Sequence, residues 1–247
     1  MKTRLIAALA VAAACIPLSQ ADARMGLAAG QCINKYHSPE DRIEYCQSYA
    51  KDGVSTDQYA DAEYALGLAY RLAGQYPQAE AAQSQVMLLD STWLNAWLER
   101  STAYAEDGKY DLALGDVEFI ATHVDDPAIA DMQRCWVRAV AGKDLDLGYS
   151  DCNNAISTHP GDFAVLLARA LISYKRGDMK NAIADLDNAV AARPKGAGAY
   201  YLRGIAKAAI NDAGAADDID KAKDLEPYID EEFAGYNVKP AAPAASK

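Results

Sequence analysis

The sequence predicts an all-α solenoid built from about five helix-turn-helix repeats. Apolar residues recur at helical spacing along most of the 247-residue chain, and the pattern returns with a period of about 34 residues. Small residues come back at the eighth and twentieth positions of most units. Because two helices that cross closely leave room there only for Gly, Ala or Ser, these positions indicate paired, tightly packed helices.

The chain begins with a segment typical of exported proteins. Lys2 and Arg4 precede an apolar run over residues 5–16, and Ala21-Asp22-Ala23 fits the small-x-small cleavage rule. We therefore expect residues 1–23 to be a signal peptide that is removed after Ala23. An alternative is lipid attachment at Cys15, since residues 12–15 resemble a lipobox that lacks its usual leucine. We expect the mature chain to be periplasmic or secreted, without an integral membrane segment.

Charge and cysteine content narrow the function classes. After cleavage, 22 basic residues face 34 acidic ones, a net charge of −12, which argues against nucleic acid or anionic lipid as the main partner. Export implies an oxidising compartment. An even number of cysteines in an exported chain predicts two disulfides, here among Cys32, Cys46, Cys135 and Cys152.

Residues 24–56 predict a helical hairpin in front of the repeats. Apolar residues follow helical spacing over residues 24–36, and a second helix begins at Ser38-Pro39, a hydroxyl cap followed by proline at the first helical position. That helix should end near Asp52-Gly53. Cys32 and Cys46 fall on the two arms, so a disulfide between them would pin the hairpin as an N-terminal cap.

The repeats resemble those of the tetratricopeptide repeat family over about residues 57–228. The first unit carries the match most fully, with Leu66-Gly67, Tyr70, Gly74, Tyr76 and Ala79 at the family's positions, and the five units start at Ala60, Leu94, Ile129, Phe163 and Ala197. The resemblance implies a right-handed solenoid whose first helices line a concave face. It also implies a protein- or peptide-binding scaffold rather than an enzyme.

Charged residues recur within the units. Arginine occupies position 7 and aspartate position 23, which predicts the pairs Arg100–Asp116, Arg169–Asp185 and Arg203–Asp218. In the third unit these positions hold Cys135 and Asp151, and Cys152 follows at position 24. We interpret a Cys135–Cys152 disulfide as a covalent replacement for the ion pair. Trp136 at position 8 breaks the small-residue rule, so we expect the third unit to be splayed.

The concave positions predict the binding surface. The Lys and Asn residues with which some family members clamp a peptide's terminal carboxylate are absent here. The predicted groove is apolar and aromatic, and it fits an apolar helix or extended segment of a protein or peptide. Burial by the next repeat or by the hairpin is the competing interpretation for each residue. The groove residues are Tyr64, Leu68, Arg71, Leu98, Thr102, Gln133, Val137, Leu167, Leu171, Tyr174, Tyr201 and Ile205.

The sequence offers no catalytic constellation, and we expect no cofactor and no metal. His37, His123 and His159 are far apart, and Ser48 with Lys51 matches an S-x-x-K pattern without its companion motifs. Two alternatives remain: an enzyme or accessory protein of cell-wall metabolism, and a self-assembling structural protein. Residues 229–238 predict a capping helix, and residues 239–247 a disordered Pro/Ala tail.

Overall fold

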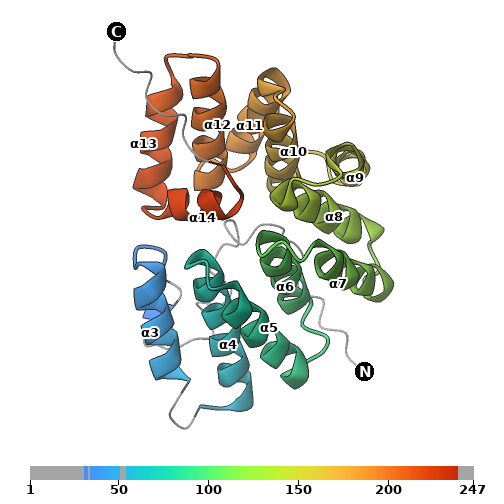
Figure 1. Cartoon of the computed structure of the whole chain (residues 1–247), viewed down its shortest axis with the longest axis vertical. Coiled ribbons are helices and arrows are strands. Elements are labelled where there is room, and N and C mark those ends of the chain that lie inside the picture. The colour runs from blue at the N-terminus through green and yellow to red at the C-terminus, as the bar shows by residue number, and fades with distance from the viewer. Residues whose placement is uncertain (1–30, 33, 51–53, 239–247) are drawn as a thin grey trace.

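The computed structural model describes residues 31–32, 34–50 and 54–238, and its regular elements there are helices (Figure 1). The expected signal peptide, Cys15, most of the first arm of the expected N-terminal hairpin (residues 24–30 and 33) and the Pro/Ala tail lie outside the described residues. The helices, in chain order, are α3 (Pro39–Tyr49), α4 (Thr56–Leu72), α5 (Tyr76–Leu89), α6 (Leu94–Glu106), α7 (Tyr110–His123), α8 (Pro127–Ala141), α9 (Leu145–Thr158), α10 (Phe163–Lys175), α11 (Met179–Ala192), α12 (Ala197–Ala209), α13 (Ala215–Leu225) and α14 (Ile229–Gly235).

Ten of these helices form five antiparallel pairs, from α4 with α5 to α12 with α13, which confirms the predicted all-α solenoid. A glycine with positive φ closes the first helix of the first four pairs: Gly74, Gly108, Gly142 and Gly177, with φ between 66° and 78°. A residue with a Cβ would be strained in this left-handed conformation, so glycine sets the turn. Asn211, with φ 57°, takes this conformation in the fifth pair.

The N-terminal cap is held by a disulfide between Cys32 and Cys46, whose Cα atoms are 4.7 Å apart. Helix α3 begins as expected, because the Ser38 hydroxyl accepts a hydrogen bond from the Asp41 amide at 3.1 Å and Pro39 follows the cap. The helix packs against α4, and Gln47 Nε2 donates to Tyr70 Oη at 2.8 Å. The cap is therefore joined to the first repeat.

The structure brings the three predicted arginine–aspartate pairs together. Each guanidinium donates two hydrogen bonds to one carboxylate: Arg100 to Asp116 at 2.9 and 2.7 Å, Arg169 to Asp185 at 2.9 and 2.6 Å, and Arg203 to Asp218 at 2.8 and 2.6 Å. Each arginine also donates to a residue 16 positions earlier, on the preceding repeat: Ser84, Asn153 and Asp187. The arginines thus connect consecutive repeats as well as the two helices of one repeat.

The third repeat corrects the register expected from the sequence. Helix α9 starts three residues after Gly142, whereas the second helix of the first, second and fourth pairs starts two residues after the turn glycine. The additional residue is Asp144, which has φ 48° and accepts a hydrogen bond from Tyr110 Oη at 2.8 Å. Helix α8 is consequently offset by one position from the alignment that starts at Ile129.

With this offset, Arg134 becomes the counterpart of the other arginines. Its Nε donates to Glu118, 16 residues earlier, at 3.1 Å. Cys135 then takes the small-residue position, so the expectation that Trp136 splays the repeat was wrong. Trp136 occupies the next position and is buried.

The Cys135–Cys152 disulfide forms, but it does not replace an ion pair. In other repeats, the residue at position 8 of the repeat, on the first helix, contacts an apolar or amide side chain of the second helix at the place that this disulfide occupies. Any Cβ on Gly67 would collide with Gln83, and one on Gly204 would lie 2.7 Å from Ile219 Cγ1. Asp151, expected to lack a cation, instead accepts a hydrogen bond from Arg138. The disulfide therefore joins the core of the third repeat.

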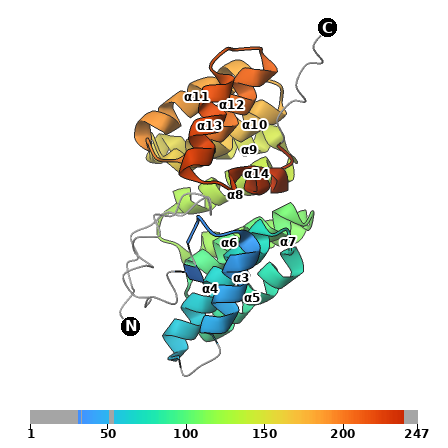
Figure 2. The ribbon, with the colours of Figure 1, turned by 90° about the vertical axis from the view of Figure 1, so that its left-hand side faces the viewer.

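The main hydrophobic core runs through the later repeats. It extends from α6 and α7 to α14 and ends at Val238, and its largest fully buried side chains include Trp136, Tyr201, Phe233 and Tyr236. Two of these four belong to the C-terminal segment that follows the last repeat. Both views place α14 between helices α3–α7 on one side and α9–α13 on the other (Figures 1 and 2).

Candidate functional site on the concave face

The first helices of the repeats (α4, α6, α8, α10 and α12) form the face on which binding was predicted, and we call it the concave face. Of the twelve predicted groove residues, Tyr64 and Tyr174 are half-buried. The others are buried, at 7% relative exposure or less: Leu68, Arg71, Leu98, Thr102, Gln133, Val137, Leu167, Leu171, Tyr201 and Ile205. These ten side chains do not line an open groove.

Contacts between successive first helices bury part of this set. Gln133 Nε2 donates to the Leu98 carbonyl oxygen at 3.1 Å and to the Ser101 and Thr102 hydroxyls at 2.6 and 3.3 Å. The two N–H groups of this amide are thereby shared among three oxygens of α6. These residues fix the angle between neighbouring repeats.

The C-terminal segment covers Tyr201 of this set and also the neighbouring Trp136. The Phe233 ring lies 5.0 Å from the ring of Tyr201 on α12, and the Tyr236 ring meets Trp136 on α8 edge-to-face at 5.2 Å. Helix α14 then reaches the first repeats, where a Cβ placed on Gly235 would come within 3.2 Å of Glu106 Oε2. The helix expected to cap only the last repeat therefore lies across the concave face and contacts both ends of the solenoid (Figure 2).

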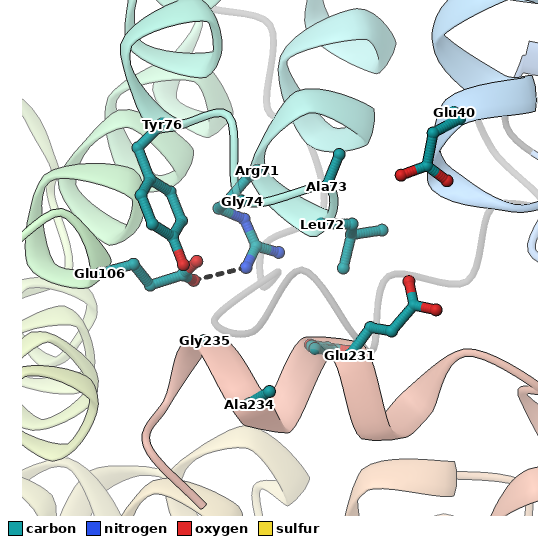
Figure 3. A pocket seen from close by; sticks show the side chains of 11 residues that line it. Glu40, Arg71, Leu72, Ala73, Gly74, Tyr76, Glu106, Glu231, Ala234 and Gly235 are labelled. Carbon is teal, nitrogen blue, oxygen red and sulfur yellow. Dashed lines mark hydrogen bonds and ion pairs between the residues drawn. The ribbon is translucent and has the colours of Figure 1, made fainter.

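A buried ionic cluster forms where α14 meets the first two repeats (Figure 3). Arg71 Nη1 donates to Glu106 Oε1 at 2.6 Å, and Arg71 Nε lies 3.5 Å from Glu99 Oε2. All three side chains are at most 4% exposed. Burial raises the pKa of Glu99 and that of Glu106 to about 7, although the nearby Arg71 charge opposes the shift.

Glu232 brings a further carboxylate from α14 into this cluster. It is buried and accepts a hydrogen bond from Tyr236 Oη at 2.5 Å. Burial raises its pKa, and its charge adds to the upward shifts of Glu99 and Glu106. Closing α14 onto the repeats thus crowds carboxylates around one arginine.

The hairpin side of α14 is also charged. Glu226 lies 3.5 Å from Lys35 Nζ, and burial raises the pKa of Glu226 to about 7. Arg42 is buried and donates to the Cys32 carbonyl oxygen at 3.3 Å, and burial lowers its pKa to about 10. The N-terminal cap and the C-terminal segment therefore meet through charged groups.

A cavity of about 380 Å³ remains between α14 and the first two repeats. Figure 3 shows Arg71 and Glu106 on one side of it and Glu231 on the other, with Tyr76 and Gly235 completing the wall. Four acids and one arginine line this space, so it favours polar or cationic groups over hydrocarbon. In the described residues, no group of three or more His, Cys, Asp or Glu is placed to hold a metal ion.

Sequence reasoning identified Arg71, Tyr201 and Leu167 but missed their partners. The register error gave Trp136 the wrong repeat position, and the sequence assigned Phe233 and Tyr236 only to a cap on the last repeat. Glu99 and Glu106 carried a usable signal, because each falls on a helix whose other core-facing positions are apolar or small. A buried acid at such a position requires a basic partner, and Arg71, at position 12 of the first repeat, lies almost at the equivalent of Glu106, at position 13 of the second.

Comparison with known proteins gives the fold. No family model matches the chain, and no curated protein matches its sequence. A tetratricopeptide repeat protein from Parabacteroides merdae is 18% identical with a TM-score of 0.63, over 89% of this chain and 88% of that one.

Two longer proteins share the architecture. Cut9 from the Cut9–Hcn1 hetero-tetramer is 16% identical with a TM-score of 0.59, over 85% of this chain and 41% of that one. Yeast Tom70 is 14% identical with a TM-score of 0.52, over 82% and 47%. The chain spans less than half the length of either. Within the described residues, no helix has the length and apolar character of a membrane span. The protein has the tetratricopeptide-repeat fold, as its period of about 34 residues predicts.

Proposed function

We propose that this protein is an exported, non-catalytic scaffold that binds a protein partner through its concave face. The observation that carries the proposal is the helix already lying there: Phe233 of α14 and Tyr236, the residue that follows the helix, lie against the aromatic side chains of α12 and α8. A surface that accepts one short helix has the shape and chemistry for another. Repeat solenoids present such extended surfaces because each unit adds to a continuous face.

Two further findings support the scaffold and its compartment. The similar protein Cut9 was crystallised in a hetero-tetramer with Hcn1, a protein assembly. The two disulfides indicate an oxidising environment, which agrees with the export signal expected over residues 1–23. The bacterial periplasm or cell envelope is the compartment that fits both.

Site-specific photo-crosslinking in cell-envelope extract tests this proposal. Residues such as Leu98 and Leu171 are too deeply buried to replace without damaging the core. Tyr174, half-buried on the concave face, can carry a photoreactive phenylalanine analogue instead. Leu147 on α9, 57% exposed, provides the control position on a second helix.

The scaffold proposal predicts a discrete protein adduct from position 174 and none of the same mass from position 147. An adduct from position 147 alone would place binding on the outer helices and contradict the proposal. A self-adduct of twice the chain mass from position 174 would instead identify a self-assembling protein.

A further inference from the structure

The contact between α14 and the repeats is incompletely satisfied. A cavity of about 380 Å³ separates them on one side. Arg71 Nη2, Trp136 Nε1 and Tyr201 Oη are buried on the concave face and form no hydrogen bond within the described residues. A buried donor without a partner has lost its hydration and gained nothing in exchange, so this occupant leaves available binding energy unused.

The buried side chains of α14 and of the residues that follow it nevertheless match the surface against which they pack. Ile229, Phe233, Tyr236 and Val238 bury apolar or aromatic side chains, while Glu232 places a carboxylate beside Arg71. Other residues of the same short helix, among them the acid that precedes Glu232, stay exposed. Ile229, Phe233 and Tyr236, the residue that caps α14, follow one another at spacings of four and three, as expected for a helix that lays one face into a groove, and Val238 follows beyond the helix.

We infer that α14 is a replaceable internal occupant of the concave face, and that the external partner is a helix of the same chemistry. That helix carries two aromatic residues one turn apart, with a carboxylate directly before the first, as in Glu232, Phe233 and Tyr236. This inference rests on the proposed scaffold function and adds the partner's pattern and its regulation: binding requires α14 to leave. The unpaired donors and the cavity give a longer partner helix the additional contacts with which it displaces α14.

A synthetic peptide of residues 227–238, labelled with fluorescein, tests this inference on the full chain. The receptor variant Phe233→Ala with Tyr236→Ala weakens the internal helix and leaves the concave residues intact. Fluorescence anisotropy should show that this variant binds the peptide roughly tenfold or more tightly than the natural chain, because apparent affinity falls with the fraction of open molecules. A peptide with the same two alanines should bind neither receptor.

The control receptor is Lys221→Ala, an exposed change on α13, which should behave as the natural chain does. If the double variant loses its helical circular dichroism, the single Tyr236→Ala chain takes its place. Equal, weak binding by all folded receptors would overturn the inference and make α14 a fixed part of the core. That outcome leaves the scaffold proposal standing, because crosslinking at position 174 tests it without reference to the sequence of α14.

Discussion

At the residue scale, the repeated arginine–aspartate pairs act as connectors of the solenoid. Burial alone would raise the pKa of Asp218, but hydrogen bonds from Arg203 and Lys207 outweigh it and the pKa falls below its ordinary value. For Asp116, which has one arginine, burial dominates and the pKa rises. The pairs are half-buried and bidentate, so they differ from exposed ion pairs, which contribute little.

A double-mutant cycle measures one connector. Arg169→Ala and Asp185→Ala, alone and together, should give a coupling energy of about 1 kcal/mol in urea unfolding. The matched cycle on Arg176 and Asp146, whose side chains are 41% and 90% exposed, should give a coupling near zero. Equal coupling in the two cycles would show that burial and bidentate geometry add nothing here.

The third-repeat disulfide provides a second residue-scale prediction. Cys135→Ala with Cys152→Ala should lower the free energy of unfolding by about 3 kcal/mol, since the bridge restricts the unfolded chain. Cys135→Ser with Cys152→Val copies the Ser101 and Val117 of the second repeat and should recover the packing part of the loss only. Non-reducing mass spectrometry that found free thiols at both positions would refute the bridge itself.

At the element scale, the sequence was informative wherever structure is local. The period, the cap at Ser38 and the turn glycines each depend on neighbours within one repeat, and the helices follow from them. The extra residue at Asp144 escaped notice because the second helix of that repeat stayed in phase while the first shifted. A length change inside a turn leaves no hydrophobic signature of its own.

The place of α14 was beyond such reasoning for a different reason. Seven residues can be predicted as a helix from their own pattern, but Trp136, against which Tyr236 docks, lies 100 residues earlier in the sequence. Apolar side chains indicate that a helix must bury one face. They do not indicate which surface that face packs against. The sequence also left open whether each residue of the concave face is exposed or buried. The contacts of Phe233 with Tyr201 and of Tyr236 with Trp136 show that the face is covered there.

The buried carboxyl groups of the ionic cluster predict how the stability of the folded chain responds to pH. Glu99 and Glu106 have a pKa of about 7 in the folded chain and about 4.5 when exposed. A carboxyl group with a raised folded pKa stabilises the folded state below its unfolded pKa, and this stability is lost as the pH rises through the folded pKa. The free energy of unfolding should therefore fall between pH 4.5 and pH 7, by at most about 1.4 kcal/mol per pH unit for each group.

Chemical unfolding across this pH range checks the prediction. Glu99→Gln with Glu106→Gln removes both titrations and should make the fall in stability less steep, even if the variant is less stable at every pH. The remaining slope belongs to Glu226 and Glu232, whose pKa values burial also raises. Asp111→Asn, an exposed change on α7, should leave the slope as it is in the natural chain. A slope in the double glutamine variant as steep as that of the natural chain would assign the pH dependence to groups other than Glu99 and Glu106.

At the scale of the whole molecule, the C-terminal segment converts an open solenoid into a closed one. Helix α3, joined to Cys32 by the disulfide at Cys46, packs on the first repeat, and the C-terminal segment returns from the last repeat to contact α12, α8 and the first two repeats. The face that we propose as the binding surface is therefore part of the protein's own core in this state. Access to it depends on the few residues of α14 rather than on the stability of the repeats.

Hydrogen-exchange mass spectrometry tests this closure most directly. In the Phe233→Ala, Tyr236→Ala chain, amides near the end of α4, around Arg71, should exchange faster than in the natural chain, although they lie some 160 residues from the changes. Amides of α5, on the outer side of the same repeat, should be unaffected. Faster exchange confined to α12, α13 and α14 would show that α14 caps only the last repeat, and it would contradict the closed solenoid.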